Sequence, residues 1–209
     1  MEMNMKKIIF ATGNQGKMNE IKEIMKDFID RNEIIMMSLK EAGVDADIVE
    51  DGKTFEENAM IKARAIAEIA DGVVLADDSG LEVDYLDKAP GIYSARFLGE
   101  DTSYDVKNTY ILDRLEGVQE EKRTARFVCA IACVLPDGNE FCLRGTIEGR
   151  IAHEIKGENG FGYDPIFYVP EFGCTTAQLP ADKKNEVSHR GRALAAMMAD
   201  LEKYYKTDK

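Results

Sequence analysis

The most informative stretch of the sequence is Val73-Val74-Leu75-Ala76-Asp77-Asp78-Ser79-Gly80-Leu81. A short apolar run bounded by turn residues predicts a buried strand, whose end would bring Asp77 and Asp78 out of the core. Neighbouring strand residues point to opposite faces, so the two carboxylates have different roles unless the chain turns between them. Carboxylates at the end of an α/β strand can hold a divalent cation. A plain surface turn is the alternative interpretation.

The composition excludes several classes of function. The chain has 209 residues and a formal net charge of −12, which argues against a non-specific binder of nucleic acid or of anionic membranes. Lys6 and Lys7 precede only four apolar residues, too few for a signal peptide, so we expect a cytoplasmic protein. The cysteines form no C-x-x-C pair, and we expect reduced thiols. No linker divides the chain, which predicts one domain over residues 1–209.

A glycine-containing turn follows the first predicted strand, residues 6–11. It reads Thr12-Gly13-Asn14-Gln15-Gly16-Lys17 and leads into a helix with an apolar stripe at Met18, Ile21, Met25, Phe28 and Ile29. Free N–H groups and the positive end of the helix dipole suit a phosphate. The spacing is not that of a P-loop, and an ordinary strand-to-helix turn is the alternative.

The following segments supply mostly scaffold. Residues 33–39 predict a second strand, and Thr54-x-x-Glu57 predicts a capping box on a helix that runs to about Gly72, with Lys62 and Arg64 as surface charges. Glu50, in the loop before this helix, has no capping role. Further predictions are a strand with Leu81, Val83 and Tyr85 alternating, a helix at 102–115, a central strand at 123–135 and a hairpin into 140–146.

Two later stretches carry polar residues in unusual settings. In residues 157–165, three glycines allow the backbone to approach a ligand closely. Phe161 and Tyr163 could stack on a planar ring, and Asp164 could form hydrogen bonds with the edge of that ring. A strand at 166–169 would anchor this loop. Ser188 is a natural N-cap for the last helix, which places His189 and Arg190 in the first turn. Cations are unfavourable there, and an anionic ligand would offset that cost.

Taken in order, six motifs resemble the Ham1/RdgB/ITPase family of nucleoside triphosphate pyrophosphatases. They are Thr12-Gly13-Asn14-x-x-Lys17, Thr54-Phe55-x-Glu57-Asn58-Ala59, Ala76-Asp77-Asp78-Ser79-Gly80-Leu81, Pro90-Gly91-Ile92-Tyr93-Ser94-Ala95-Arg96, Gly160-Phe161-Gly162-Tyr163-Asp164-Pro165 and Ser188-His189-Arg190-Gly191. The resemblance implies an α/β fold with an elongated, twisted mixed sheet, flanking helices, two lobes around a ligand cleft, and a homodimer. It also implies hydrolysis of ITP, XTP and their deoxy forms to the monophosphate and pyrophosphate.

The resemblance also implies roles for individual residues. Asp78 would be the proton acceptor and a Mg²⁺ ligand, and Glu50 the second metal carboxylate, with Asp51 as the alternative. Substrate contacts would come from the turn (Thr12, Gly13, Asn14, Gln15, Gly16, Lys17), from Ser79, and from a nucleoside group formed by Phe161, Gly162, Tyr163, Asp164, Lys184, His189 and Arg190. The adjacent Lys183 is the alternative to Lys184, because the sequence does not fix which of the two lysines matches the family position. Neither a nucleic-acid polymer nor a membrane is an expected partner.

Selectivity would come from the purine edge. Hypoxanthine and xanthine carry an acceptor oxygen where adenine carries an amino donor, and a fixed donor, Arg190 or neighbouring backbone, would favour the oxygen. A nucleotide sensor without catalysis and a pyrophosphatase of broad base specificity are the alternatives.

Overall fold

The computed structural model describes residues 6–207. Within this range one sheet has the strand order β2-β1-β3-β4-β5-β6-β7. The strands are β1 (Lys6–Phe10), β2 (Ile34–Ser38), β3 (Val73–Val83), β4 (Thr124–Val134), β5 (Glu140–Ile151), β6 (Phe167–Val169) and β7 (Cys174–Thr175). The sheet is mixed, because β1 pairs parallel with β2 and β3 whereas β6 pairs antiparallel with β5 and β7. The predicted α/β class with a mixed sheet is confirmed.

The helices follow the strands in an α/β pattern. They are α1 (Gln15–Ile24), α2 (Lys26–Asn32), α3 (Phe55–Ala67), α4 (Tyr104–Arg114), α5 (Ala181–Val187) and α6 (His189–Thr207). None of the helices in the described range is long and apolar enough to cross a membrane. By its internal contacts the chain divides into two compact units. Unit 1 is Met1–Asp78, Cys129–Gly145 and Arg190–Lys209, and unit 2 is Ser79–Val128 and Thr146–His189. The single two-lobed domain stays a prediction.

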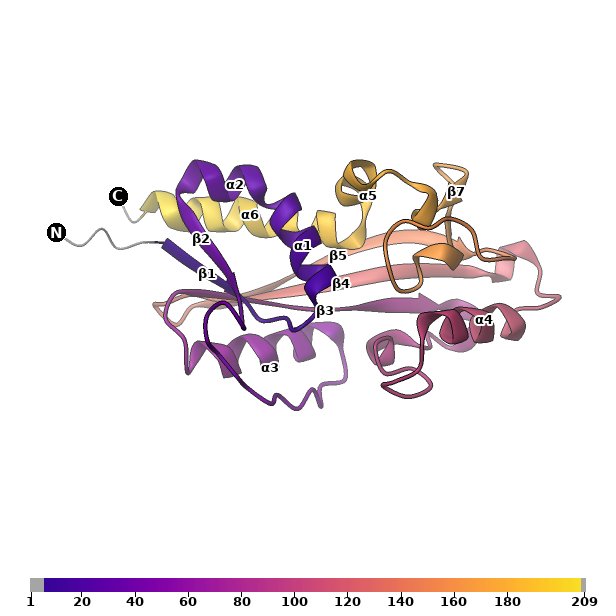
Figure 1. The fold of residues 1–209 in the computed structure, drawn as a ribbon, viewed down its shortest axis with the longest axis horizontal. Coiled ribbons are helices and arrows are strands. Elements are labelled where there is room, and N and C mark those ends of the chain that lie inside the picture. The colour runs from indigo at the N-terminus through magenta and orange to yellow at the C-terminus, as the bar shows by residue number, and fades with distance from the viewer. Residues whose placement is uncertain (1–5, 208–209) are drawn as a thin grey trace. The chain divides into compact units, whose positions relative to one another are not determined.

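In unit 1, helices cover both faces of the strands. Figure 1 shows α1, α2 and α6 on one face and α3 on the other. The predicted apolar stripe packs against β1 and α6, with Met18, Ile21, Met25 and Phe28 buried in one cluster and Ile29 partly buried beside it. The stripe belongs to two helices, because the chain leaves helical geometry at Met25. Burial of this stripe, rather than helix propensity, stabilises such short helices.

Unit 2 has its own apolar cluster, in which α4 packs with Phe127, Ile147 and Phe167. Arg123, predicted to open the central strand, instead precedes β4 and is buried. Its guanidinium donates to the carbonyls of Leu115, Ile151 and Ala152. The end of α4 is thereby joined to the end of β5, and the buried donors are satisfied.

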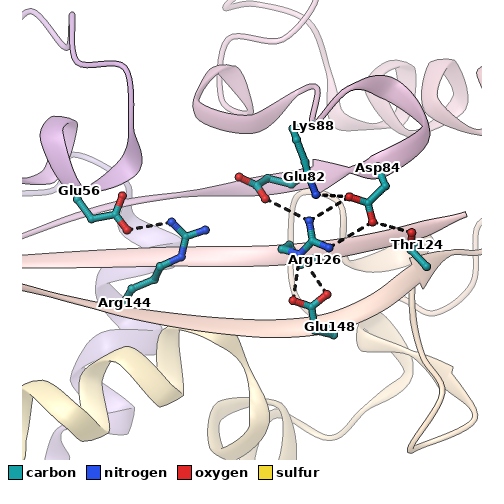
Figure 2. A network of polar contacts seen from close by, with 8 residues as sticks. All are labelled: Glu56, Glu82, Asp84, Lys88, Thr124, Arg126, Arg144 and Glu148. Carbon is teal, nitrogen blue, oxygen red and sulfur yellow. Dashed lines mark hydrogen bonds and ion pairs between the residues drawn. The ribbon is translucent and has the colours of Figure 1, made fainter.

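A polar network crosses the outer surface of three strands in unit 2. Figure 2 shows Arg126 of β4 between Glu82 of β3 and Glu148 of β5, with Asp84 contacting two of its nitrogens. Asp84 also accepts hydrogen bonds from Thr124 and Lys88. Cross-strand pairs of opposite charge stabilise neighbouring strands.

Several predicted element bounds are wrong. The strand through Asp77 and Asp78 does not end in a turn, because β3 continues to Val83. Helix α3 ends at Ala67 and not near Gly72. Tyr85 lies in a short 3₁₀ helix, Asp84–Leu86, and is exposed. Strand β5 runs past residue 146 to Ile151, and β6 begins only at Phe167 because residues 164–166 form another 3₁₀ turn.

Candidate active site

The turn after β1 forms the N-terminus of α1. Asn14 is the N-cap, and its side-chain oxygen accepts from the backbone N–H of Lys17 at 3.0 Å. Thr12 Oγ1 accepts from the N–H of Asn14 at 3.2 Å. Gly13, Gln15 and Gly16 are exposed, and a Cβ at Gly13 would meet nothing within 4 Å. The helix end is thus ordered by its own side chains while its outer surface stays open.

A hollow of about 510 Å³ lies beside this turn, within unit 1. One side is formed by residues 12–15 and Met18, and the other by the loop after β2, including Leu39, Lys40 and Gly43. The sequence pattern predicted no role for this loop. Gly43 has a φ of +68°, a conformation that favours glycine. This glycine is the one residue type in the sequence of the loop that could have indicated a defined backbone turn there.

Asp77 lies in a buried charge network. Its carboxylate is 3.0 Å from Lys17 Nζ of α1 and 3.7 Å from Arg190 Nη2 of α6. Arg190 Nη1 also donates to Glu20 at 2.6 Å. Burial alone would raise the pKa of Asp77, but the positive charges of Lys17 and Arg190 outweigh it and hold the pKa below its ordinary value. Asp77 is therefore ionised and engaged in fixing α1 and α6 to β3.

This network gives Arg190 protein partners that the sequence did not indicate, and its predicted contact with substrate stays a prediction. Its guanidinium is only 2% exposed and pairs with carboxylates of unit 1. The anion expected to offset a cation in the first turn of α6 is supplied by the protein itself, through Glu20 and Asp77. The prediction missed Glu20 because its carboxylate lies on the buried side of an otherwise charged helix.

Asp78 has a different environment, on the side of β3 that α3 covers. Its carboxylate accepts from Asn58 Nδ2 at 3.1 Å. Burial raises the pKa of Asp78 to about 6, and the charge of Glu50 adds to this, while Lys62 and the Asn58 hydrogen bond oppose it. Glu50 accepts from Lys62 Nζ at 3.0 Å. A carboxyl with a pKa close to neutrality is suited to exchange protons at physiological pH.

Helix α3 positions these polar groups. Thr54 caps it by accepting from the N–H of Glu57, as predicted, but Glu57 accepts from Lys53 N and not from Thr54 N. Asn58 and Lys62 are four residues apart and share one helix face. Lys62 was predicted to be a surface charge, yet its side chain is 14% exposed and paired. The i, i+4 spacing of Asn58 and Lys62 could have indicated a shared site.

The residues present fit a divalent cation held jointly with a ligand. No group of three or more His, Cys, Asp or Glu side chains with metal-binding geometry occurs among the described residues. Asp78 and Glu50 are nevertheless close enough for the charge of one to raise the pKa of the other. Mg²⁺ is typically held by one or two carboxylates, with phosphate and water oxygens completing its shell. Asp51 is exposed, and Asp77 is occupied by Lys17.

In unit 2 the glycine-rich loop is organised around Asp164. Its buried carboxylate accepts from Lys184 Nζ at 2.7 Å, from Thr176 Oγ1 at 2.8 Å and from the backbone N–H of Phe161 at 2.8 Å. A Cβ at Gly160 would collide with this carboxylate, which explains the glycine there. Asp164 therefore holds the loop, and its predicted hydrogen bond to the edge of a bound ring stays a prediction.

The aromatic residues of the loop have unequal exposure. Phe161 is 38% exposed, with Lys184 Nζ 5.0 Å from its ring centroid. Tyr163 is buried and donates its hydroxyl hydrogen to the carbonyl of Ser94 at 2.8 Å. Only Phe161 of the two presents a ring that a ligand could stack on.

The remaining predicted residues are placed as follows. His189 stacks on Phe127, with ring centroids 4.8 Å apart and planes 15° apart. Ser79 follows Asp78 on β3 and is half-buried. The side chain of Lys184 is 8% exposed, whereas that of Lys183 is 42% exposed and pairs with Glu186. Lys184 is thus the lysine that the fold directs into the loop.

The fold and these groups of side chains define an α/β protein with an open helix N-terminus and a paired-carboxylate site. More specifically, the chain belongs to the Ham1 family, whose model matches residues 8–200. It is 47% identical over 203 residues to the dITP/XTP pyrophosphatase of Clostridium perfringens, covering 94% of this chain and 98% of that protein.

Two solved structures are similar over almost the whole chain. The Ham1 protein of Staphylococcus aureus is 43% identical with a TM-score of 0.83, over 95% of this chain and 100% of that one. The HAM1 protein of Coxiella burnetii is 40% identical with a TM-score of 0.84, over the same shares of the two chains.

Proposed function

We propose that this chain hydrolyses ITP, XTP and their deoxy forms to the nucleoside monophosphate and pyrophosphate. The relative from Clostridium perfringens, matched along nearly its whole length, is named for dITP and XTP. The observation that carries the proposal is the placement of Asp78, a buried carboxyl that accepts from Asn58 and lies near the Glu50–Lys62 pair, and its raised pKa of about 6 agrees with this. That arrangement suits water activation near neutral pH.

The triphosphate is held in this proposal by residues 12–17. The exposed residues Gln15 and Gly16 at the start of α1, with the positive end of its dipole, favour phosphate oxygens. Thr12 and Asn14 keep the turn in place through their hydrogen bonds. Lys17, with 20% of its side chain exposed, adds positive charge near the turn while it stays paired with Asp77.

Glu50 and Asp78 would hold Mg²⁺. When bound, the ion would draw charge from the phosphate oxygens and from the pyrophosphate leaving group. Glu50 is favoured over Asp51 because its charge acts on Asp78, whereas Asp51 is exposed. Lys62 holds Glu50 in place and limits the repulsion between the two carboxylates.

Asp78 is the proton acceptor of the proposed reaction. Water attacks the α-phosphorus, a new O–P bond forms, and the bond from phosphorus to the bridging oxygen of pyrophosphate breaks. The proton lost by water passes to the carboxylate of Asp78, which Asn58 orients through its amide. Pyrophosphate leaves with the electron pair of the broken bond, and its charge is balanced near the amides and Lys17.

For the nucleoside we propose Ser79, Phe161, Gly162, Lys184 and His189 as contacts. The exposed ring of Phe161 supports stacking with a purine. Tyr163 and Asp164 act by holding the loop, and Arg190 acts by holding Asp77. The candidate donors that would select the purine oxygen are the backbone of the loop, Lys184 and Arg190, and both side chains also pair with carboxylates of the protein.

A comparison of ITP, XTP, ATP and GTP with Mg²⁺ tests the function, with products separated by ion-exchange chromatography. We expect monophosphate and pyrophosphate, formed fastest from ITP and XTP. Diphosphate with orthophosphate would instead indicate attack at the γ-phosphorus. Tight binding without pyrophosphate release would indicate a sensor, and equal rates on all four would indicate broad specificity.

The homodimer implied by the resemblance and the cytoplasmic location expected from the N-terminal sequence stay predictions. Sedimentation equilibrium of the purified chain tests the first, and fractionation of the source cells tests the second.

A further inference from the structure

Two adjacent residues of α4, Lys107 and Asn108, are buried although both are polar. They are 1% and 2% exposed, respectively. Lys107 Nζ donates to the carbonyl of Ala95 at 2.6 Å, and Asn108 Nδ2 donates to the carbonyl of Gly162 at 3.0 Å. Burying polar side chains costs free energy unless they make such bonds. One helix turn therefore holds two separate backbone segments, at Ala95 and at Gly162.

These two segments are also bonded to each other. Tyr163 donates its hydroxyl hydrogen to the carbonyl of Ser94 at 2.8 Å. Ser94 Oγ in turn accepts from the N–H of Leu81 on β3 at 2.9 Å. The motif around Ser94, which received no role in the proposed reaction, is thus part of a closed set of contacts with α4 and the glycine-rich loop. All members of the set lie in unit 2.

Gly162 is the point at which this set fixes the loop. Its φ is +69°, in the left-handed region that favours glycine. The neighbouring Tyr163 packs edge-on against Tyr104 of α4, with ring centroids 5.2 Å apart and planes 88° apart. The hydrogen bond from Asn108 holds the Gly162 carbonyl, and Tyr104 holds the ring of the next residue. Together they define the backbone that carries Phe161.

The side-chain oxygen of Asn108, Oδ1, supports a functional role for this residue in addition to a contribution to stability. Asn108 Oδ1 is buried and has no hydrogen-bond partner within the described part of the chain. A buried acceptor without a partner is costly, and such groups in native proteins often have a functional reason. The bond from its nitrogen to the Gly162 carbonyl offsets part of this cost.

We propose that Asn108 is a positioning residue for purine recognition, an inference that rests on the proposed function. By holding the Gly162 carbonyl it sets the direction of the Phe161 ring and of the adjacent peptide groups. Loss of this bond weakens the distinction between purines and leaves the residues around Asp78 unchanged.

Asn108→Ala and Asn108→Asp test the inference. The Asp variant keeps the shape but replaces the donor by an acceptor, which the Gly162 carbonyl repels. In both variants we expect kcat/KM for ITP to fall about tenfold or more and kcat/KM for ATP to fall less than about threefold. The ratio of kcat/KM for ITP to kcat/KM for ATP therefore decreases. Affinity for ITP, measured by calorimetry with EDTA present, should fall in parallel. Thr109→Ala, at the exposed next position of α4, should change neither quantity.

An equal fall for ITP and ATP in a folded variant would assign Asn108 a purely structural role and overturn the inference. An unchanged ratio in Asn108→Asp would also overturn it, as would a wild type that does not distinguish ITP from ATP. A wild type that releases pyrophosphate from no triphosphate would overturn the proposed function instead. In that case the affinities of the variants for ITP and for ATP, compared by calorimetry, still test Asn108. If Asn108→Ala does not fold, the isosteric Asp variant decides.

Discussion

Asp77 and Asp78 are consecutive on β3, yet Asp77 lies 3.0 Å from Lys17 Nζ whereas Asp78 accepts from Asn58 at 3.1 Å. Successive side chains of a strand point to opposite faces, so the first carboxylate meets α1 and α6 and the second meets α3. Their pKa values move in opposite directions as a result, lowered for Asp77 and raised for Asp78. Asp77 therefore joins α1 and α6 to β3, and Asp78 is the acid that we propose as the proton acceptor.

Asp78→Asn should reduce kcat by about a hundredfold or more, since it removes the proton acceptor and a metal carboxylate. In the wild type, kcat/KM at subsaturating Mg²⁺ should fall on the acid side with a midpoint near pH 6, because Asp78 must be ionised to act. Steady-state assays of pyrophosphate release between pH 5 and pH 9 measure both. Full turnover in Asp78→Asn would remove the assignment.

The same variant should be more stable than the wild type. The pKa of Asp78 is about 6 in the folded protein against an ordinary value of 3.8, so ionisation opposes folding at neutral pH. The cost is about 3 kcal/mol at pH 8 and roughly half that at pH 5, because the folded form takes up the proton first as the pH falls. Urea unfolding of both proteins at the two pH values measures this. A gain in stability that grows towards pH 5 would contradict the argument.

Asp77→Asn should destabilise the protein by about 3–5 kcal/mol at pH 7, because Lys17 loses its counter-charge and Arg190 loses one of its two carboxylates. The pKa of Asp77 is lowered in the folded state, so its contribution is present above the ordinary carboxyl pKa and is lost as the pH falls below it. Urea unfolding at pH 7 measures the loss. The exposed Asp51→Asn is the control and should change stability little.

Lys184→Met and Lys183→Met form a matched pair on α5. Removing Lys184 leaves Asp164 buried without its cation, which should cost about 3–5 kcal/mol and raise KM for ITP. Removing Lys183 breaks an exposed pair with Glu186, worth about 0–1 kcal/mol. Denaturation midpoints and KM values distinguish the two, and equal effects would show that Asp164 does not need its lysine.

Arg126→Ala should cost more than Arg144→Ala. Arg126 contacts Glu82, Asp84 and Glu148 on neighbouring segments of unit 2, and its loss should cost about 1–3 kcal/mol. Arg144 makes one ion pair, with Glu56 in unit 1, worth about 0–1 kcal/mol (Figure 2). Thermal unfolding at low and at 1 M salt measures both, and a larger loss for Arg144 would contradict this ranking.

Local sequence patterns predicted the helices and strands better than they predicted which charged residues form ion pairs. The apolar stripe from Met18 to Phe28 identified the buried helical face, because its spacing depends only on neighbouring residues. Asp77 and Asp78 were predicted to leave the core because acidic residues with Ser and Gly are typical of turns. The structure keeps them in β3 because Lys17 and Arg190, 60 and 113 residues away in the chain, stabilise Asp77.

The candidate site shows the same limit. Arg190 was predicted to contact a ligand because a cation at a helix start needs an anion, and the sequence could not reveal that Glu20 pairs with it inside the protein. The sequence could not distinguish the roles of Lys183 and Lys184, because the packing of α5 in the folded protein decides which of the two side chains is buried. Asn108 lacked any local signal, because its partner Gly162 is 54 residues away.

The position of the two acids within a strand limits which changes in chain length the protein tolerates. One residue inserted between Leu75 and Asp77 would move Asp77 to the α3 side and Asp78 to the side of α1 and α6, exchanging their surroundings. A residue added to the loop at 44–49 would leave both in place. Chimeras between relatives should therefore be joined in that loop and not within the first half of β3.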